Sequence, residues 1–203
     1  MTEIYFHEDD YCQIEVLPIS NWEHCAAQIG EIESFSKVRR APGGIGWTDM
    51  YVREENSSSL HDLGISRTTF ASALCEALPE CDAVYTGYST HREKCEQTAA
   101  FGNSTEVAVF ADFGKDDVVE HIWLALDVTE QDEVELMLKA FHALGTLSDL
   151  LLVDWGWGVL SPLNDGDALK RYMLKRIEVF SEIRASFAPS NPKPKWWQFW
   201  KRR

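Results

Sequence analysis

LLLVDWGWGVLSPL, residues Leu150 to Leu163, is the stretch of sequence that decides the fold. It begins with four consecutive aliphatic residues and passes through a Trp-Gly-Trp-Gly sequence to a proline. A short, continuously apolar run beside glycine and proline is typical of a strand that is buried on both faces. The stretch therefore predicts a central strand over 150–160 that opens into a bend, with the rest of the chain packed around it.

Hydrophobic periodicity predicts strands and amphipathic helices elsewhere in the chain. The expected strands cover 4–6, 11–17, 48–53, 83–89, 107–113 and 118–128, and the last two form a β-hairpin. The expected helices cover 21–40, 66–78, 129–145 and 165–188. Segment 90–103 shows no clean period and is expected to be a loop with at most one helical turn.

The order of these elements indicates the fold class. Strands come in pairs instead of alternating with helices, which favours an α+β fold over a doubly wound one. The prediction is a single domain over 1–188, with a mostly antiparallel sheet of five to seven strands packed against three to four amphipathic helices. The strand at 11–17 is expected to cover a core on one face only, and the helix near 21–40 is expected to lie flat on the sheet. Thr129 with Asp132 resembles a capping box.

Charge is the strongest compositional feature of the chain. It has 19 basic and 33 acidic residues, for a net charge of −14. Five of the basic residues fall in the last eleven positions, so Met1 to Pro192 carries 14 basic against 33 acidic residues, or −19. Phosphate contacts require clustered lysine and arginine, so this body should repel nucleic acid and anionic membranes. A basic protein is the more natural partner, although surplus carboxylates also serve solubility.

The sequence also restricts the compartment. The five cysteines are an odd number without a CxxC pair, which favours reduced thiols over a disulfide framework. No apolar run approaches the ~20 residues that a membrane helix needs, and the first ten residues carry no basic region ahead of an apolar segment. A cytoplasmic protein is expected.

Aromatic residues near acids in predicted loops are the candidate binding site. Aromatic rings supply contact area and carboxylates steer the encounter with a basic surface. The leading hypothesis is therefore an acidic binding module that neutralises or sequesters a basic protein, as immunity and inhibitor proteins do. The predicted binding residues are Trp47, Asp49, Tyr51, Arg53, Tyr85, Tyr88, Asp154, Trp155 and Trp157.

The alternative hypothesis is a small-molecule-binding domain or an enzyme, with a cleft between the 41–53 loop and the 154–157 strand. Asp154 is the most informative acid because a carboxylate in an apolar strand either pairs with an arginine or has its pKa raised. It could also simply bond local amides or indole N–H groups at the strand end.

Other motifs do not reach the specificity needed to assign chemistry. The glycines at 43–46 follow a predicted helix and precede a strand, which is the reverse of a phosphate-binding loop, so a structural turn is expected. The acidic run at 7–10 is expected to be a solvated turn because neighbours in an extended chain diverge. His91 with Cys95 lacks a second pair of zinc ligands. No metal, cofactor or catalytic set is predicted.

The C-terminal tail, 189–203, differs from the rest of the chain. Trp196, Trp197 and Trp200 lie among five basic residues and follow three prolines, Pro189, Pro192 and Pro194. Indoles among cations are typical of segments that bind membrane interfaces weakly. The tail is expected to contact a membrane surface, to dock on the acidic body, or to be a flexible end.

Overall fold

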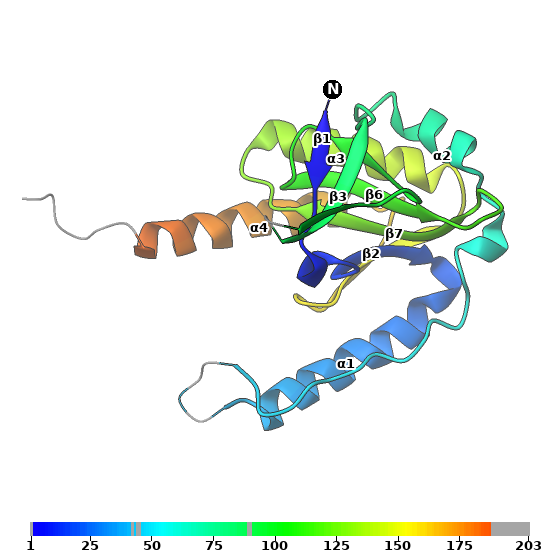
Figure 1. Cartoon of the computed structure of the whole chain (residues 1–203). Coiled ribbons are helices and arrows are strands. Elements are labelled where there is room, and N and C mark those ends of the chain that lie inside the picture. Colours follow the sequence, from blue (N-terminus) through cyan, green and yellow to red (C-terminus); the bar gives the residue numbers. More distant parts are fainter. Residues whose placement is uncertain (1, 42, 44–45, 89–90, 188–203) are drawn as a thin grey trace, which may run out of the picture.

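A six-stranded antiparallel sheet forms the middle layer of the molecule (Figure 1). The computed structural model of the chain describes residues 2–41, 43, 46–88 and 91–187. The strand order is β5-β6-β7-β2-β8-β9. The bounds are β2 Ile14–Pro18, β5 Thr98–Gly102, β6 Val107–Phe113, β7 Val119–Leu126, β8 Leu150–Asp154 and β9 Val159–Pro162.

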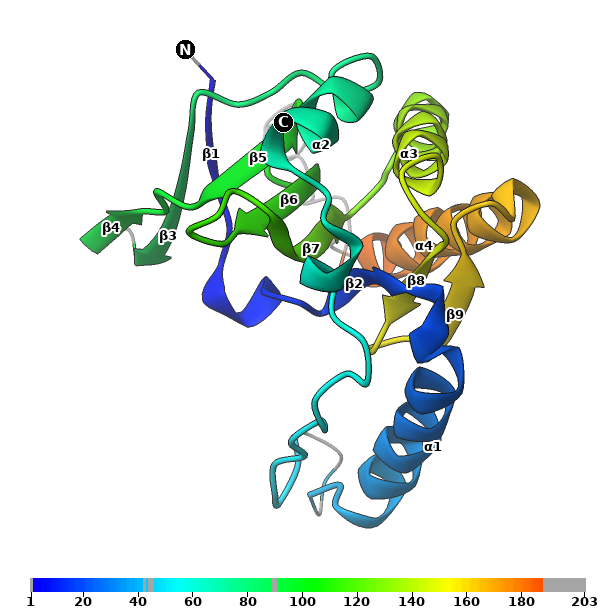
Figure 2. The ribbon, with the colours of Figure 1, turned by 90° about the vertical axis from the view of Figure 1, so that its right-hand side faces the viewer.

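Three helices cover one face of this sheet, as Figure 2 shows. They are α2 (Arg67–Leu74), α3 (Gln131–Gly145) and α4 (Gly166–Phe187). The largest core cluster joins Phe70, Phe141 and Met173 from these helices to Val16 and Leu152 of the sheet. Because side chains alternate along a strand, only every second residue of β2 and β8 belongs to this cluster.

The opposite face is divided between two covers. A small sheet of β1 (Glu3–Tyr5), β3 (Ala83–Tyr88) and β4 (His91–Lys94) packs on the β5–β7 half, with β1 parallel to β3. Helix α1 (Trp22–Val38) covers the β2–β8 half. Three short 3-10 helices, at Glu8–Asp10, Ile19–Asn21 and His61–Leu63, complete the described elements.

Helix α1 packs on the sheet through Trp22, Cys25, Ile29 and Ile32. Cys25 and Gln28 are its only fully buried residues, and its C-terminal end projects from the body with the following chain running back beside it (Figure 1). Tyr51 of the returning chain donates a hydrogen bond to Glu31 (2.8 Å) and packs against Phe35. We call residues 30–54 the arm.

The fold class is the predicted one, α+β in a single domain with a largely antiparallel sheet. The predicted β6–β7 hairpin and all four predicted helices are present. Ser66 caps α2 by accepting from the Thr69 amide (3.2 Å), and Asp165 caps α4 by accepting from the Ala168 amide (2.9 Å). Among the described residues, no helix is both long and apolar enough to cross a bilayer.

Several strand predictions are wrong. The stretch 150–160 is two strands joined at the Trp-Gly turn, not one. The first of them, β8, is an interior strand buried on both faces as predicted, but it lies second from the edge of the sheet. Segment 48–53 is no strand, because its neighbour is helix α1. Segment 90–103 contains β4 and β5, which were missed because β4 is a fully exposed charged edge strand and β5 is rich in small residues.

Three finer predictions also need correction. β2 is buried on both faces, because α1 and the Glu15 contacts described below cover its second face. Helix α1 does not lie flat along its length. The capping box of α3 uses Glu130 and Glu133 in place of Thr129 and Asp132, since Glu130 has the extended backbone of an N-cap residue and exchanges hydrogen bonds with Glu133.

Candidate functional site

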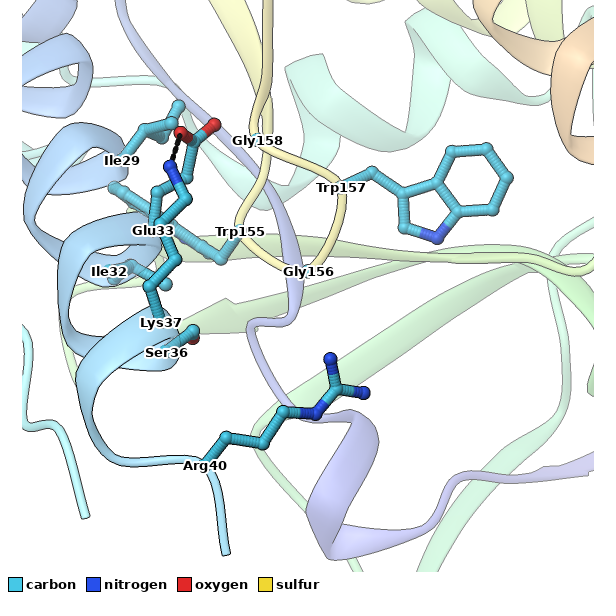
Figure 3. A pocket seen from close by; sticks show the side chains of 10 residues that line it. All are labelled: Ile29, Ile32, Glu33, Ser36, Lys37, Arg40, Trp155, Gly156, Trp157 and Gly158. Carbon is cyan, nitrogen blue, oxygen red and sulfur yellow. Dashed lines mark ion pairs between the residues drawn. The ribbon is translucent and has the colours of Figure 1, made fainter. Parts of the chain in front are cut away.

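The turn between β8 and β9 is the centre of the candidate site. It comprises Trp155, Gly156, Trp157 and Gly158. The Trp157 amide donates to Oδ1 of Asp154 (2.9 Å), and Gly158 has a left-handed φ of +62° that a residue with a Cβ rarely adopts. The two indoles point to opposite sides of the turn, Trp155 toward α1 and Trp157 away from it (Figure 3).

On the α1 side, Trp155 belongs to a buried charged cluster. Its indole Nε1 donates to Oε1 of Glu15 (2.5 Å), and the guanidinium of Arg53 pairs with the same oxygen. Arg53 also lies over the Trp155 ring, 4.5 Å from its centroid, and donates to the Cys12 carbonyl (3.2 Å). The carboxylate is therefore neutralised and bonded, which explains how β2 tolerates a buried Glu15.

On the α4 side, Asp154 belongs to a second buried cluster. Its Oδ2 accepts from the Tyr172 hydroxyl (2.5 Å) and from Nη1 of Arg176 (2.8 Å). Nε of Arg176 donates to the Leu126 carbonyl (2.9 Å), and its guanidinium lies 4.9 Å from the Trp157 ring centroid. Burial, followed by the negative charge of Asp154, raises the pKa of Tyr172, so the phenol stays a hydrogen-bond donor.

The turn separates two hollows. The helix-side hollow has a volume of about 520 Å³ and is shown in Figure 3. Its walls are Ile29 and Ile32 of α1, Trp155 and the turn backbone. Its polar lining residues are Glu33, Ser36, Lys37 and Arg40. Glu33 pairs with Lys37 (3.6 Å), whereas the Arg40 guanidinium has no polar partner among the described residues.

The acidic hollow lies on the other side of the turn and has a volume of about 280 Å³. It opens at the end of the sheet where β7 and β8 finish and β2 and β6 begin. Its ionisable lining residues are four acids, Asp10, Glu106, Asp127 and Asp154, and one base, Arg176. Asp154 and Asp127 both contact Arg176, at 2.8 and 3.4 Å, so four acids against one base leave the hollow with an excess of three negative charges.

The predicted binding residues do not form one face. Arg53 and Trp155 meet at Glu15, and Asp154 and Trp157 meet at Arg176. The other members lie apart. Trp47 pairs with Arg40 and Asp49 lies near Arg39 just after α1, Tyr51 lies beside α1, and Tyr85 lies in the small sheet under Arg92. Tyr88 is the last residue of β3 and pairs with His91 of β4, and the position of its side chain is not among the described parts of the structure.

The partners of these residues were not predicted. Tyr172 lies on the buried face of α4, and Arg176 lies one turn further along that face, so the spacing of Arg176 gave a signal for an inward-pointing arginine. Asp154 was expected either to pair with an arginine or to bond local amides, and it does both. Nothing in the sequence identified Asp10 and Glu106 as neighbours of the turn.

The other candidate chemistries find no support in the described part of the chain. All five cysteines are free. No group of three or more histidine, cysteine or acidic side chains among the described residues could hold a metal ion. The tail indoles Trp196, Trp197 and Trp200 lie outside the described residues.

Comparison with known proteins gives no relative. No protein family model, no curated protein and no solved structure matches this chain.

Proposed function

We propose that this protein is a binding module that captures a basic protein partner, with the acidic hollow as the seat for one lysine or arginine side chain. The observation that supports the proposal is that Asp10, Glu106 and Asp127 line one hollow together with the half-buried Trp157. Carboxylates at the rim steer a cation toward the hollow, and an indole face attracts it further.

The size of the hollow favours a single side chain over a small-molecule substrate. Its volume of about 280 Å³ is below the roughly 300–1,000 Å³ typical of sites for drug-sized ligands. The floor is held by the Asp154–Arg176 ion pair and the Tyr172 hydroxyl, so the site is preformed and a partner would lose little free energy in ordering it. Sequestration of the partner, as by immunity or inhibitor proteins, and a cytoplasmic location remain predictions from the sequence.

The test is capture of partners from the native cell by three forms of the protein. These are the wild type, the hollow variant Asp10→Asn/Glu106→Gln and the control Glu76→Gln/Glu135→Gln. The control removes two exposed carboxylates away from the hollow, one just after α2 and one in α3. We expect a basic protein that is retained at about 0.05 M salt and released at about 0.5 M. The hollow variant should bind it roughly tenfold more weakly and the control normally. Equal capture by the hollow variant would contradict the proposal.

The helix-side hollow supports a second candidate function, the binding of a small organic anion. The supporting observation is the unpartnered Arg40 guanidinium beside an apolar wall of Ile29, Ile32 and Trp155. This hollow lies between the turn and α1, so the 41–53 loop contributes none of its lining. Benzoate should raise the melting temperature of the wild type but not of Arg40→Gln, and benzylamine should raise neither. An equal rise with both ligands would remove this candidate.

A further inference from the structure

Three different groups receive the guanidinium of Arg53. The Glu15 carboxylate pairs with its Nη1, and its Nη2 donates to the Cys12 carbonyl (3.2 Å). The guanidinium carbon lies 4.5 Å from the centroid of the Trp155 ring. Only 6% of Glu15 and 7% of Trp155 are exposed. A carboxylate, a carbonyl and an indole face are the groups with which proteins recognise a guanidinium, so this cluster has the chemistry of a binding site for one.

The receiving groups are held by the sheet and do not depend on the arginine for their positions. Glu15 belongs to β2, an interior strand that pairs with β7 on one side and with β8 on the other. Trp155 directly follows β8, and its indole Nε1 donates to Oε1 of Glu15 (2.5 Å). A site carried by paired strands is preformed, so a ligand loses little free energy in ordering it.

The arginine itself comes from a segment that the fold holds less firmly. Residues 49–59 form no helix or strand, and none of them is buried. No backbone–backbone hydrogen bond joins this segment to another described residue. Two of its amides are held by side chains instead, with Glu54 donating to Gln28 (3.1 Å) and Ser58 donating to Asn21 (3.0 Å). Segments with few buried apolar contacts open at a small cost in free energy, so the arginine is able to leave its site.

Arg53 leaves part of the site unused. It bonds the carboxylate through Nη1 alone, and no described residue donates to Oε2 of Glu15. A guanidinium that is free to orient donates two parallel hydrogen bonds to one carboxylate. Cys12, which supplies the carbonyl, has a left-handed φ of +54°, a conformation that non-glycine residues adopt rarely and mostly near functional sites. The site therefore suits a freely oriented guanidinium better than the tethered one.

We propose that Glu15, Trp155 and the Cys12 carbonyl form a binding site for a guanidinium group, and that Arg53 closes this site until the guanidinium of a ligand replaces it. The exchange keeps one cation beside the buried carboxylate, so the charge of Glu15 is compensated before and after it. An ammonium lacks the planar fork that reaches a carboxylate and a carbonyl together, so arginine is favoured over lysine. The proposal does not depend on the acidic hollow, because none of these four residues lines it.

The first test empties the site with Arg53→Ala and uses Arg67→Ala as the matched control. The two arginine side chains are almost equally exposed, at 31% and 32%. Arg67 also pairs with an acid, Asp117 (2.9 Å), and lies 4.0 Å from the centroid of the Phe113 ring, but Asp117 is 59% exposed, so water replaces the lost partner there. Methylguanidinium at about 10 mM, roughly tenfold above the dissociation constant expected for so small a ligand, should raise the melting temperature of Arg53→Ala by about 3–6 °C more than that of Arg67→Ala.

Two further conditions make this test specific. Methylammonium carries the same charge without the fork and should raise the melting temperature of neither variant. Glu15→Gln/Arg53→Ala lacks the carboxylate and should not respond to methylguanidinium. An equal rise for Arg53→Ala and Arg67→Ala, an equal rise with methylammonium, or a rise for the double variant would overturn the proposal.

The second test uses the wild type, so it also decides the question if Arg53→Ala does not fold. The indole N–H resonance of Trp155, identified by its loss in Trp155→Phe, reports the bond to Glu15. It should shift when agmatine or a capped Gly-Arg-Gly peptide is added, at about tenfold higher concentrations than Arg53→Ala needs, because the tethered arginine competes. A response to agmatine alone assigns the site to a small guanidinium compound, and a response to the peptide assigns it to an arginine of a protein. The proposal is overturned if neither ligand shifts this resonance at up to about 50 mM, or if capped Gly-Lys-Gly shifts it equally.

Discussion

Asp154 at the end of β8 and Arg176 in α4 form an ion pair with 2.8 Å between Oδ2 and Nη1, and their exposed fractions are only 2% and 6%. The pair connects the candidate site to the core, because Arg176 also bonds the last carbonyl of β7 and lies beside the Trp157 ring. Removing one member leaves a charge in a low-dielectric environment without its partner, which costs far more than the pair itself contributes.

We therefore expect Arg176→Met to lower the free energy of unfolding by about 3–5 kcal/mol, measured by urea denaturation. The triple variant Asp154→Leu/Tyr172→Phe/Arg176→Met should lose less, because it leaves no unpaired polar group. Asp127→Asn is the matched control, since Asp127 contacts the same guanidinium (3.4 Å) from an exposed position and should cost less than about 1 kcal/mol. An Arg176→Met protein as stable as this control would contradict the prediction.

The turn glycines should differ sharply in their tolerance of alanine. A Cβ on Gly158 would be forced into a left-handed φ of +62° and would meet Cγ2 of Ile29 at 3.2 Å. The left-handed conformation alone costs about 1–2 kcal/mol, so Gly158→Ala should lower the free energy of unfolding by at least that amount. A Cβ on Gly156 would meet only Oδ1 of Asp154, at 3.5 Å, so Gly156→Ala should be nearly neutral. Urea denaturation of both variants checks this, and equal stability would show that the φ of Gly158 carries no cost.

The elements that the sequence predicted best are those that bury one face, because their apolar residues then recur with the period of a helix or a strand. The stripe of Val134, Met137 and Phe141 marks α3 because all three residues pack on the sheet. β4 gave no such signal, since its four residues are all exposed. Segment 48–53 gave a misleading one, because alternation in an extended chain looks the same beside a helix as in a sheet.

The candidate site could be predicted only in part, because the residues that contact each other there are far apart in the sequence. Asp154 stands out locally, because a carboxylate inside an apolar run needs an explanation. Its partner Arg176 is 22 positions away, and Glu15 is 140 positions from Trp155, so tertiary packing alone brings each pair together. Trp47 and Tyr85 show the opposite effect of tertiary packing. Both are aromatic residues near acids in the sequence, but the fold places one on the arm and the other in the small sheet.

The contact between His61 and Asp116 makes stability depend on pH near neutrality. Nε2 of His61 lies 2.8 Å from Oδ2 of Asp116, joining the Leu60–Gly64 turn to the β6–β7 turn. This hydrogen bond, followed by the charge of Asp116, raises the pKa of His61 above 6.5, and the same bond lowers the pKa of Asp116 below 3.8. Both side chains are about half exposed, so the effect is modest.

The signs of the two shifts define the pH window. Stability from His61 is fully present below its unfolded pKa of 6.5 and is lost as pH rises through the raised folded pKa. Stability from Asp116 is present above 3.8 and is lost as pH falls through the lowered folded pKa. The wild type should therefore lose stability relative to His61→Gln as pH rises from about 6 to about 8. In an NMR titration, Asp116→Asn should return the His61 midpoint toward 6.5 and Glu106→Gln, in the acidic hollow, should leave it unchanged. A midpoint unaffected by Asp116→Asn would show that this carboxylate does not hold the proton on His61.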